Sequence, residues 1–212
     1  MIGAIAAVAL AAASMDAALP EGTNHYLLYA GDKQSATSTI GIYRDANGVR
    51  IDEQTFSSGE QINTIRTLNA TTFSATLYRV TLHGSNEIMA ATPTGADYHV
   101  GDKTTTLAQL TPGPAMMLDS FVGAYIGLPA MVAATGAQKF NVYCACSAGA
   151  TASLATVVPT TATRPEGLPH NDRSLSLTLD TGVVTLWYDP TTFILHELDA
   201  PDAHLKIVRS QS

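Results

Sequence analysis

Short stretches rich in Thr, Val, Ile, Leu and Tyr run along almost the whole chain, and Gly, Asn and Pro separate them. Evenly spaced stretches of this kind predict an antiparallel meander rather than alternating strands and helices. The sequence Asp-Ala-Asn-Gly at 45–48 predicts a tight hairpin turn, because Asn-Gly readily adopts positive φ. Leu175, Leu177 and Leu179 alternate with polar residues, as in a half-buried strand. Strands are predicted over 25–30, 38–44, 49–56, 61–68, 72–83, 87–91, 97–100, 103–110, 139–146, 151–159, 174–179, 183–188, 193–199 and 205–208.

The β-like pattern is interrupted after Pro114 by a continuous apolar segment over residues 115–128. This segment predicts a helix that begins near Pro114, where proline fits the first turn, and that ends or kinks at Pro129. The apolar surface of this helix is wide, so we expect the helix to be buried in the domain. A transmembrane span is the alternative, but Asp119 and the nearby glycines argue against it.

The composition favours one globular domain over a disordered or nucleic-acid-binding chain. Hydrophobic residues make up 46% of the 212 residues, which is enough to bury a core, and charged residues make up only 14%. The net charge is −7 and no run of Lys and Arg occurs, so a nucleic acid is not expected as a partner. We expect a single antiparallel domain over about 24–210, with the helix at about 115–128.

An unbroken apolar run over residues 2–13, followed by small residues and then Asp16, is typical of a secretory signal peptide. The run is too short to span a bilayer, which requires about 20 residues. No Lys or Arg precedes it, so an N-terminal apolar helix packed on the domain is the alternative. The sequence predicts that residues 1–15 form a signal peptide or apolar segment and that the protein is periplasmic or secreted.

The C-terminal part resembles exported bacterial β-meander domains. The stretch Val-Thr-Leu-Trp-Tyr-Asp-Pro-Thr-Thr at 184–192, followed by Ile-Leu-His-Glu-Leu at 194–198, is similar to a strand–turn–strand pair of those domains. The order of meander, apolar helix beginning near Leu118-Asp119 and second meander is similar to that of the lipoprotein-localisation carriers and of exported domains of unknown function. This resemblance, which covers about residues 24–209 in layout, implies a mainly β (α+β) fold. In that fold a curved antiparallel sheet, an open half-barrel, wraps around one buried helix and holds an apolar ligand or acyl chain.

No catalytic motif or cofactor motif is found. Cys-Ser-Ala-Gly at 146–149 lacks the first glycine of a nucleophile elbow, and no glycine-rich phosphate loop occurs. The six histidines are scattered, so no metal site is predicted. On a strand, Cys144 and Cys146 point to the same face, and we expect either two thiols or one strained local bridge.

Carboxylates could in principle support glycoside hydrolysis, which needs two of them. Two of the candidates have simpler interpretations, because Asp189 precedes Pro190 in a turn and Asp119 could cap the predicted helix. The five candidates are Glu53, Asp97, Asp119, Asp189 and Asp199.

Aromatic and Met side chains could instead line an apolar pocket between sheet and helix. The alternative is that they belong to an ordinary core. The leading hypothesis is an exported, non-enzymatic domain that binds a lipid or other hydrophobic ligand. A structural or protein-interaction module of the cell envelope is the alternative, and an unrecognised hydrolase ranks third. The candidate ligand-binding residues are Tyr78, Met117, Phe121, Tyr125 and Trp187.

Overall fold

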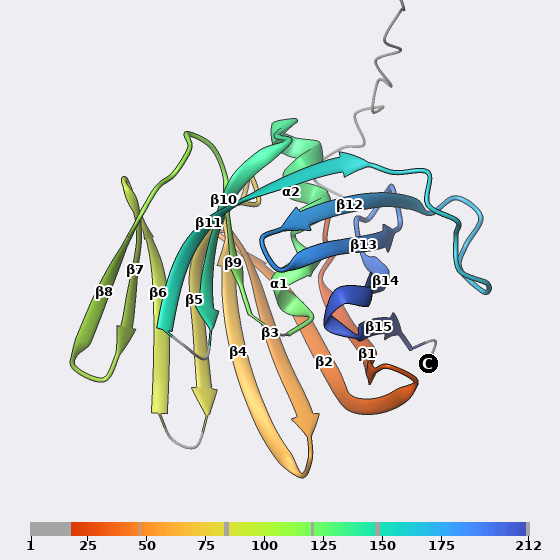
Figure 1. Cartoon of the computed structure of the whole chain (residues 1–212), viewed down its shortest axis with the longest axis horizontal. Helices are drawn as coiled ribbons and strands as arrows, with labels where there is room; N and C mark the ends of the chain where they lie inside the picture. Colours follow the sequence, from red (N-terminus) through yellow and green to blue (C-terminus); the bar gives the residue numbers. More distant parts are fainter. Residues whose placement is uncertain (1–17, 47, 83–84, 120, 147–148, 211–212) are drawn as a thin grey trace, which may run out of the picture.

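One continuous sheet of 15 strands forms the body of the protein (Figure 1). The computed structural model describes residues 18–46, 48–82, 85–119, 121–146 and 149–210, so the expected signal segment lies outside the described residues. The strands are β1 (Gly22–Ala30), β2 (Lys33–Asp45), β3 (Gly48–Ser57), β4 (Glu60–Leu68), β5 (Ala75–Leu82), β6 (Ser85–Thr92), β7 (Gly95–Val100), β8 (Lys103–Ala108), β9 (Ala115–Leu118), β10 (Lys139–Cys146), β11 (Gly149–Pro159), β12 (Arg173–Leu179), β13 (Gly182–Tyr188), β14 (Leu195–Ala200) and β15 (Leu205–Arg209).

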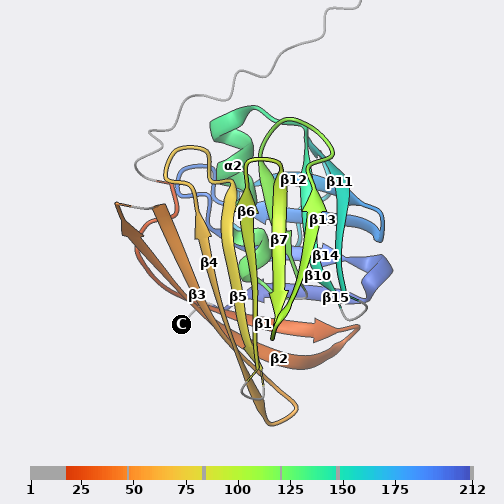
Figure 2. The same ribbon diagram turned by 90° about the vertical axis from the view of Figure 1, so that its left-hand side faces the viewer.

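Almost every strand pairs in antiparallel fashion with its neighbour in the sequence, as a meander requires. Two pairings depart from that rule. The first strand, β1, pairs with the last, β15, with Leu28 opposite Ile207, and this pairing joins the two halves of the chain into one sheet. The short strand β9 pairs in parallel with β10, with Met116 opposite Val142. The predicted mainly β fold, with a curved antiparallel sheet around a helical segment, is confirmed (Figure 2).

The predicted helix over 115–128 is wrong in its first part and too short at its end. Residues Ala115–Leu118 form β9, and the helical residues are α1 (Gly123–Ile126) and α2 (Leu128–Thr135). A run of consecutive apolar residues suits a strand buried on both faces as well as a buried helix, and the edge of β10 accommodates it as a strand. Pro129 lies in the first turn of α2, where no backbone donor is needed, so it begins a helix rather than ending one.

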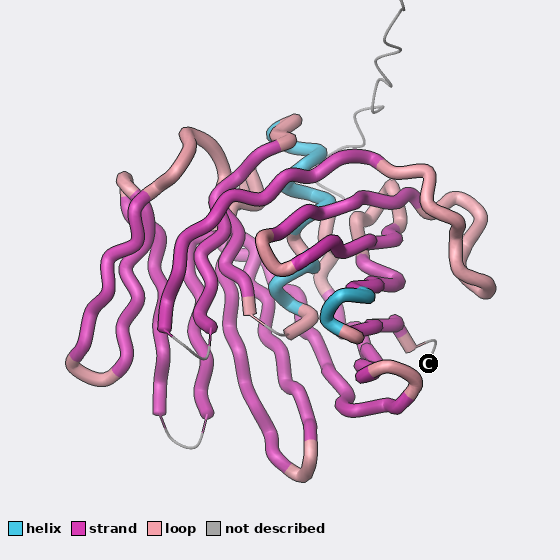
Figure 3. The backbone as a smooth tube through the Cα atoms, viewed as in Figure 1, coloured by secondary structure: helices cyan, strands magenta, loops and turns pink. Residues whose placement is uncertain are grey.

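The helices lie on the inner side of the curved sheet, where the strands surround them (Figure 3). Every residue of α1 is buried, and so is the first half of α2. The apolar strand residues Ile51, Leu68 and Leu186 are at most 5% exposed. The predicted burial of the helix is therefore confirmed. Among the helices of the described residues, none is both long enough and apolar enough to cross a membrane.

The same six-residue turn connects β4 to β5 and β13 to β14. In both turns a side-chain oxygen of the first residue accepts two backbone N–H groups; Asn69 does so at 2.9 Å and Asp189 at 2.7 and 2.9 Å. Both turns contain Thr-Thr-Phe, and the buried Phe73 and Phe193 have φ of 54° and 58°. The predicted role of Asp189 as a turn residue is confirmed, and the first half of the chain repeats that turn.

Candidate functional site

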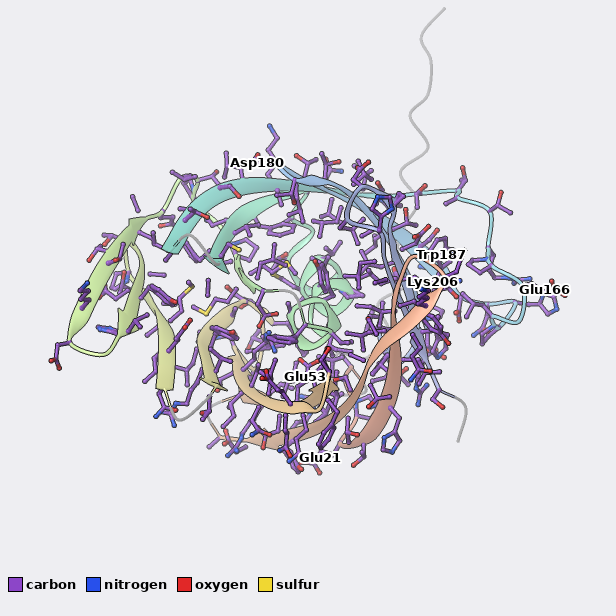
Figure 4. All side chains as sticks on the ribbon, turned by 60° about the horizontal axis from the view of Figure 1, so that its bottom comes forward. Glu21, Glu53, Glu166, Asp180, Trp187 and Lys206 are labelled. Atoms are coloured by element: carbon purple, nitrogen blue, oxygen red, sulfur yellow. The ribbon has the colours of Figure 1, made fainter. Side chains whose placement is uncertain are left out.

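A buried carboxylate, that of Glu53 on β3, fastens the beginning of the helical segment to the sheet. Its Oε1 accepts the Ser38 hydroxyl at 2.7 Å and the Val122 N–H at 3.1 Å. Its Oε2 accepts the Gly123 N–H at 2.9 Å and the Arg66 Nη1 at 3.3 Å. Figure 4 shows Glu53 on the inner side of the sheet, toward the helices. Because the backbone donors before and within the first turn of α1 have Glu53 as their acceptor, this carboxylate positions α1. The hydroxyls of Thr55 and Thr64 also donate to it.

Arg66 on β4 connects Glu53 to a second carboxylate, that of Asp119. The Nη2 group of Arg66 donates to Asp119 Oδ2, and the guanidinium lies 5.0 Å from the centre of the Tyr78 ring. Asp119 Oδ1 accepts the Phe121 N–H at 2.8 Å. The side chains of Arg66, Glu53 and Asp119 are only 2%, 0% and 5% exposed. The structure therefore buries two carboxylates with one guanidinium between them.

Asp119 is the carboxylate whose protonation this environment changes most clearly. Burial raises the pKa of Asp119 from 3.8 to about 6. Arg66 opposes this rise in pKa, Glu53 adds to it, and hydrogen bonds from Phe121 and Tyr78 oppose it further. Perturbed carboxylates of this kind gather at functional sites, which makes Asp119 a candidate when it also borders a cavity.

A cleft of about 330 Å³ does lie beside Asp119. It is bounded by the end of β9, by Tyr125 of α1, by the β12–β13 turn and by the segment that leads from β14 into β15; Figure 1 shows that turn beside α1. Most of the lining is apolar. The lining residues are Leu118, Asp119, Tyr125, Cys144, Ala145, Leu179, Thr181, Gly182, Val183, Val184, Ala200, Asp202, Ala203 and Leu205.

The polar groups in the lining are acidic or neutral. Asp202, in the short 3-10 helix η2 (Pro201–Ala203), accepts the Val183 N–H at 3.2 Å and so closes one end of the β12–β13 turn. Burial and, to a smaller extent, Asp119 raise the pKa of Tyr125 to about 12 against the opposing effect of Arg66. The Tyr125 hydroxyl therefore stays neutral and serves as a hydrogen-bonding group. None of the described residues that line the cleft is Lys, Arg or His.

The predicted ligand-binding residues do not gather in one place. Tyr125 lines the cleft, whereas Tyr78 is not part of its lining and bonds to Asp119 through its hydroxyl, and Phe121 donates its backbone N–H to Asp119. Met117 is buried on β9 next to a different and much smaller pocket. Trp187 follows Leu186 on β13 and thus faces the other side of the sheet, near Lys206 (Figure 4).

That smaller pocket lies between the helices and β4–β5, the space where the resemblance places an apolar ligand. Its volume is about 20 Å³, which is room for about one water molecule. A Cβ on Gly127 would lie 2.5 Å from Leu68 Cδ1, so helix and sheet are in direct contact there. The ligand-sized cleft is instead on the opposite side of α1, against β10 and β13.

A second hollow of about 330 Å³ is polar and contains His196 and Arg209. His196 occupies a bulge of β14, where its Nδ1 lies 2.8 Å from the buried Asp172 and its Nε2 lies 3.2 Å from Arg209 Nη1. An Asp–His pair of this kind could orient a general base. Here, however, the outer nitrogen of the imidazole faces a guanidinium, where a nucleophilic hydroxyl would have to lie.

The remaining candidates have structural partners. Asp97 accepts the Thr106 hydroxyl at 2.8 Å on the exposed face of β7 and β8, and Asp199 lies opposite Lys206 on β15, whose ammonium group pairs with Glu197 at 2.9 Å. Cys144 is disulfide-bonded, which agrees with the second of the two expected states. In the described part of the chain, no three His, Cys, Asp or Glu residues are grouped so that they could hold a metal ion.

Comparison with known proteins gave no relative. No family model matches the sequence, and no curated protein or solved structure matches it significantly. The function has to be argued from the residues themselves. Sequence reasoning named both Glu53 and Asp119 but treated them as separate candidates, and Arg66, which joins them, was missed. A lone arginine among Thr and Ile residues in a strand was the available signal, because a charge on a core-facing position requires a partner.

Proposed function

We propose that the protein is a non-enzymatic binding domain whose cleft holds a small, mainly apolar ligand. The observation that carries the proposal is the 330 Å³ cleft, whose apolar lining is combined with a few polar groups at Asp119, Tyr125 and Asp202. Binding pockets for small molecules have this composition and begin at about 300 Å³. That volume suits a short-chain or single-ring ligand better than a whole lipid.

The cleft is held in shape by the buried network beside it. Asp119 is bonded to Arg66 and to the Phe121 backbone, and α1, which bears Tyr125, is fastened to Glu53 through two backbone N–H groups. A wall fixed in this way loses little conformational entropy when a ligand enters, which favours binding. The proposal extends the expectation of an exported carrier, for which the apolar run at 2–13 is the support.

The proposal is tested by titrating hexan-1-ol, a neutral apolar probe, into the ¹⁵N-labelled protein and following backbone resonances by NMR. We expect saturable shifts of residues around the cleft, such as Ala145 and Val184. The variant Ala145→Phe places a ring in the cleft and should abolish binding. Ala108→Phe makes the same change on the exposed end of β8 and should leave binding intact.

Retention of the native fold by both variants is checked by circular dichroism and thermal unfolding. Absence of saturable binding to the native chain, or equal binding by Ala145→Phe and Ala108→Phe, would overturn the proposal. Native mass spectrometry after organic extraction adds an independent readout, since a bound small molecule would be seen at about one per chain.

The second candidate function is that of an interaction module, which the edge of β8 favours. Among the described strands β8 is hydrogen-bonded to β7 alone, and Lys103 to Thr106 are all exposed. Figure 1 shows β8 at one end of the sheet. An exposed strand edge can accept a further strand from a partner. Concentration-dependent self-association on size exclusion, without binding of hexan-1-ol, would favour this function over ligand binding.

A further inference from the structure

We infer that the ligand of the cleft carries a positively charged amine next to its apolar body. The inference rests on the proposed function, because it specifies the chemistry of the ligand that the cleft binds. Three observations support it: the charge balance of the buried network, the charge of the cleft lining, and the unused acceptor capacity of Asp119.

The buried network has one negative charge in excess. Glu53 and Asp119 contribute two carboxylates, and Arg66 contributes the one guanidinium bonded to both. Both Nη groups of Arg66 are engaged, since Nη1 also donates to the Thr64 hydroxyl at 2.8 Å. A buried charge without a counter-charge is costly, so a cation placed beside Asp119 would be favoured.

The rest of the cleft adds no positive charge that could balance Asp119. Asp202 contributes a second carboxylate, and the other polar lining residues, Thr181 and Tyr125, are neutral hydroxyls. An anionic ligand such as a fatty acid would therefore bring a third carboxylate into an acidic cleft. This charge distribution disfavours an acyl carboxylate and favours an ammonium group.

Asp119 retains acceptor sites for such a group. Its Oδ1 accepts the Phe121 N–H, its Oδ2 accepts Arg66, and the Tyr78 hydroxyl also bonds to the carboxylate. A carboxylate can accept about four hydrogen bonds, so one N–H group of an amine can be added without displacing any of these three partners. Burial raises the pKa of Asp119 to about 6 although Arg66 lowers it, and a pKa of about 6 leaves the group mostly ionised at about pH 7.5.

The test compares three probes with the same six-carbon chain: hexylamine, hexan-1-ol and hexanoate. Affinities are measured by NMR titration at about pH 7.5, where an alkylamine is protonated because its pKa resembles that of Lys, about 10.4. We expect hexylamine to bind at least about tenfold more tightly than hexan-1-ol, since a hydrogen bond to a charged group in a sheltered site contributes about tenfold to a hundredfold. We expect hexanoate to bind at least about tenfold more weakly than hexan-1-ol.

Asp119→Asn removes the charge with almost no change in shape and should reduce the preference for hexylamine over hexan-1-ol to less than about threefold. Asp199→Asn removes an equal charge from a position outside the cleft and should preserve the preference. If Asp119→Asn does not fold, Asp202→Asn and the ranking of the probes on the native chain still decide the question.

The outcomes separate this inference from the proposed function. If hexan-1-ol binds in the cleft but hexylamine binds no more tightly, the cleft is a binding site and the amine inference is wrong. Binding of hexanoate at or above the level of hexan-1-ol contradicts it equally. If none of the three probes binds, the proposed function fails, and the inference fails with it.

Discussion

Replacing Glu53 by Gln should destabilise the protein far more than the same kind of change at Asp52, the preceding residue in the strand. Glu53→Gln keeps the shape of the side chain but removes the charge that is paired with Arg66. In the native chain the two carboxylate oxygens accept the backbone N–H groups of Val122 and Gly123. In the variant one of these oxygens is replaced by an amide N–H₂, which would place a donor against a backbone donor. Asp119 stays paired with Arg66, so the loss of stability comes from the hydrogen bonds that Glu53 accepts. A hydrogen bond to a charged group contributes about 1.5–3 kcal/mol, and weakening two of them should cost about 3–6 kcal/mol, a large part of the about 5–15 kcal/mol that stabilises a typical domain.

Asp52→Asn is the matched control. Asp52 also pairs with an arginine, Arg50, at 2.7 Å, but the two side chains are 33% and 48% exposed. Exposed ion pairs contribute about 0–1 kcal/mol, so the free energy of unfolding of this variant should be within about 1 kcal/mol of that of the native chain. The two variants thus separate the effect of burial from the effect of losing a carboxylate.

Urea unfolding followed by circular dichroism gives the free energy of unfolding for each variant, with the slope checked for two-state behaviour. In a thermal scan the expected loss for Glu53→Gln corresponds to about 6–24 °C, at about 2–4 °C per kcal/mol for a domain of this size. A difference of less than about 1 kcal/mol between Glu53→Gln and Asp52→Asn would refute the reasoning, because it would mean that the buried network contributes no more than a surface pair.

Three further predictions concern the surroundings of this network and the repeated turn. Gly123→Ala should lower the free energy of unfolding by about 1–3 kcal/mol, because the new Cβ would lie 2.6 Å from Arg66 Nη1. Gly41→Ala is the control, since the nearest atom there is the hydroxyl of Tyr43, a 51% exposed residue that can move aside. Urea unfolding compares the two variants. The pKa of Asp119 is about 6 in the folded chain and 3.8 ordinarily, so the folded chain binds this proton more tightly. As the pH falls from about 6 to about 4, Asp119 should therefore add up to about 3 kcal/mol to the free energy of unfolding. Unfolding curves of the Asp119→Asn variant across that pH range should lack this increase. Asp189→Ala should lower the free energy of unfolding by about 1–2 kcal/mol, because it removes the acceptor of two backbone N–H groups. Asp189→Asn should leave it nearly unchanged, since Asn69 accepts the equivalent two N–H groups in the other turn. A loss of stability in Asp189→Asn as large as in Asp189→Ala would contradict this account.

The charge of the network could not be inferred from the sequence because its members are distant in the chain. Asp119 follows an apolar run and so had a simple local explanation as a capping residue, whereas Glu53 was a candidate by residue type alone. Their connection through Arg66 exists because β3 and β4 are adjacent in the sheet and the chain returns over them after β9. The location of the cleft depends in turn on the β12–β13 turn, which belongs to the other half of the sheet.

The sequence by itself determined the local structure of this protein: the positions of the strands, the turn at Asp189 and the burial of the helical segment, because side-chain periodicity and turn chemistry act between residues a few positions apart. Only the tertiary structure decided that residues 115–118 are a strand, that β1 pairs with β15, and that one side of α1 is packed while the other borders a cleft. These features depend on which segments meet across the sheet, and an apolar or acidic side chain has the same local pattern whether it meets the core, a partner or a cavity.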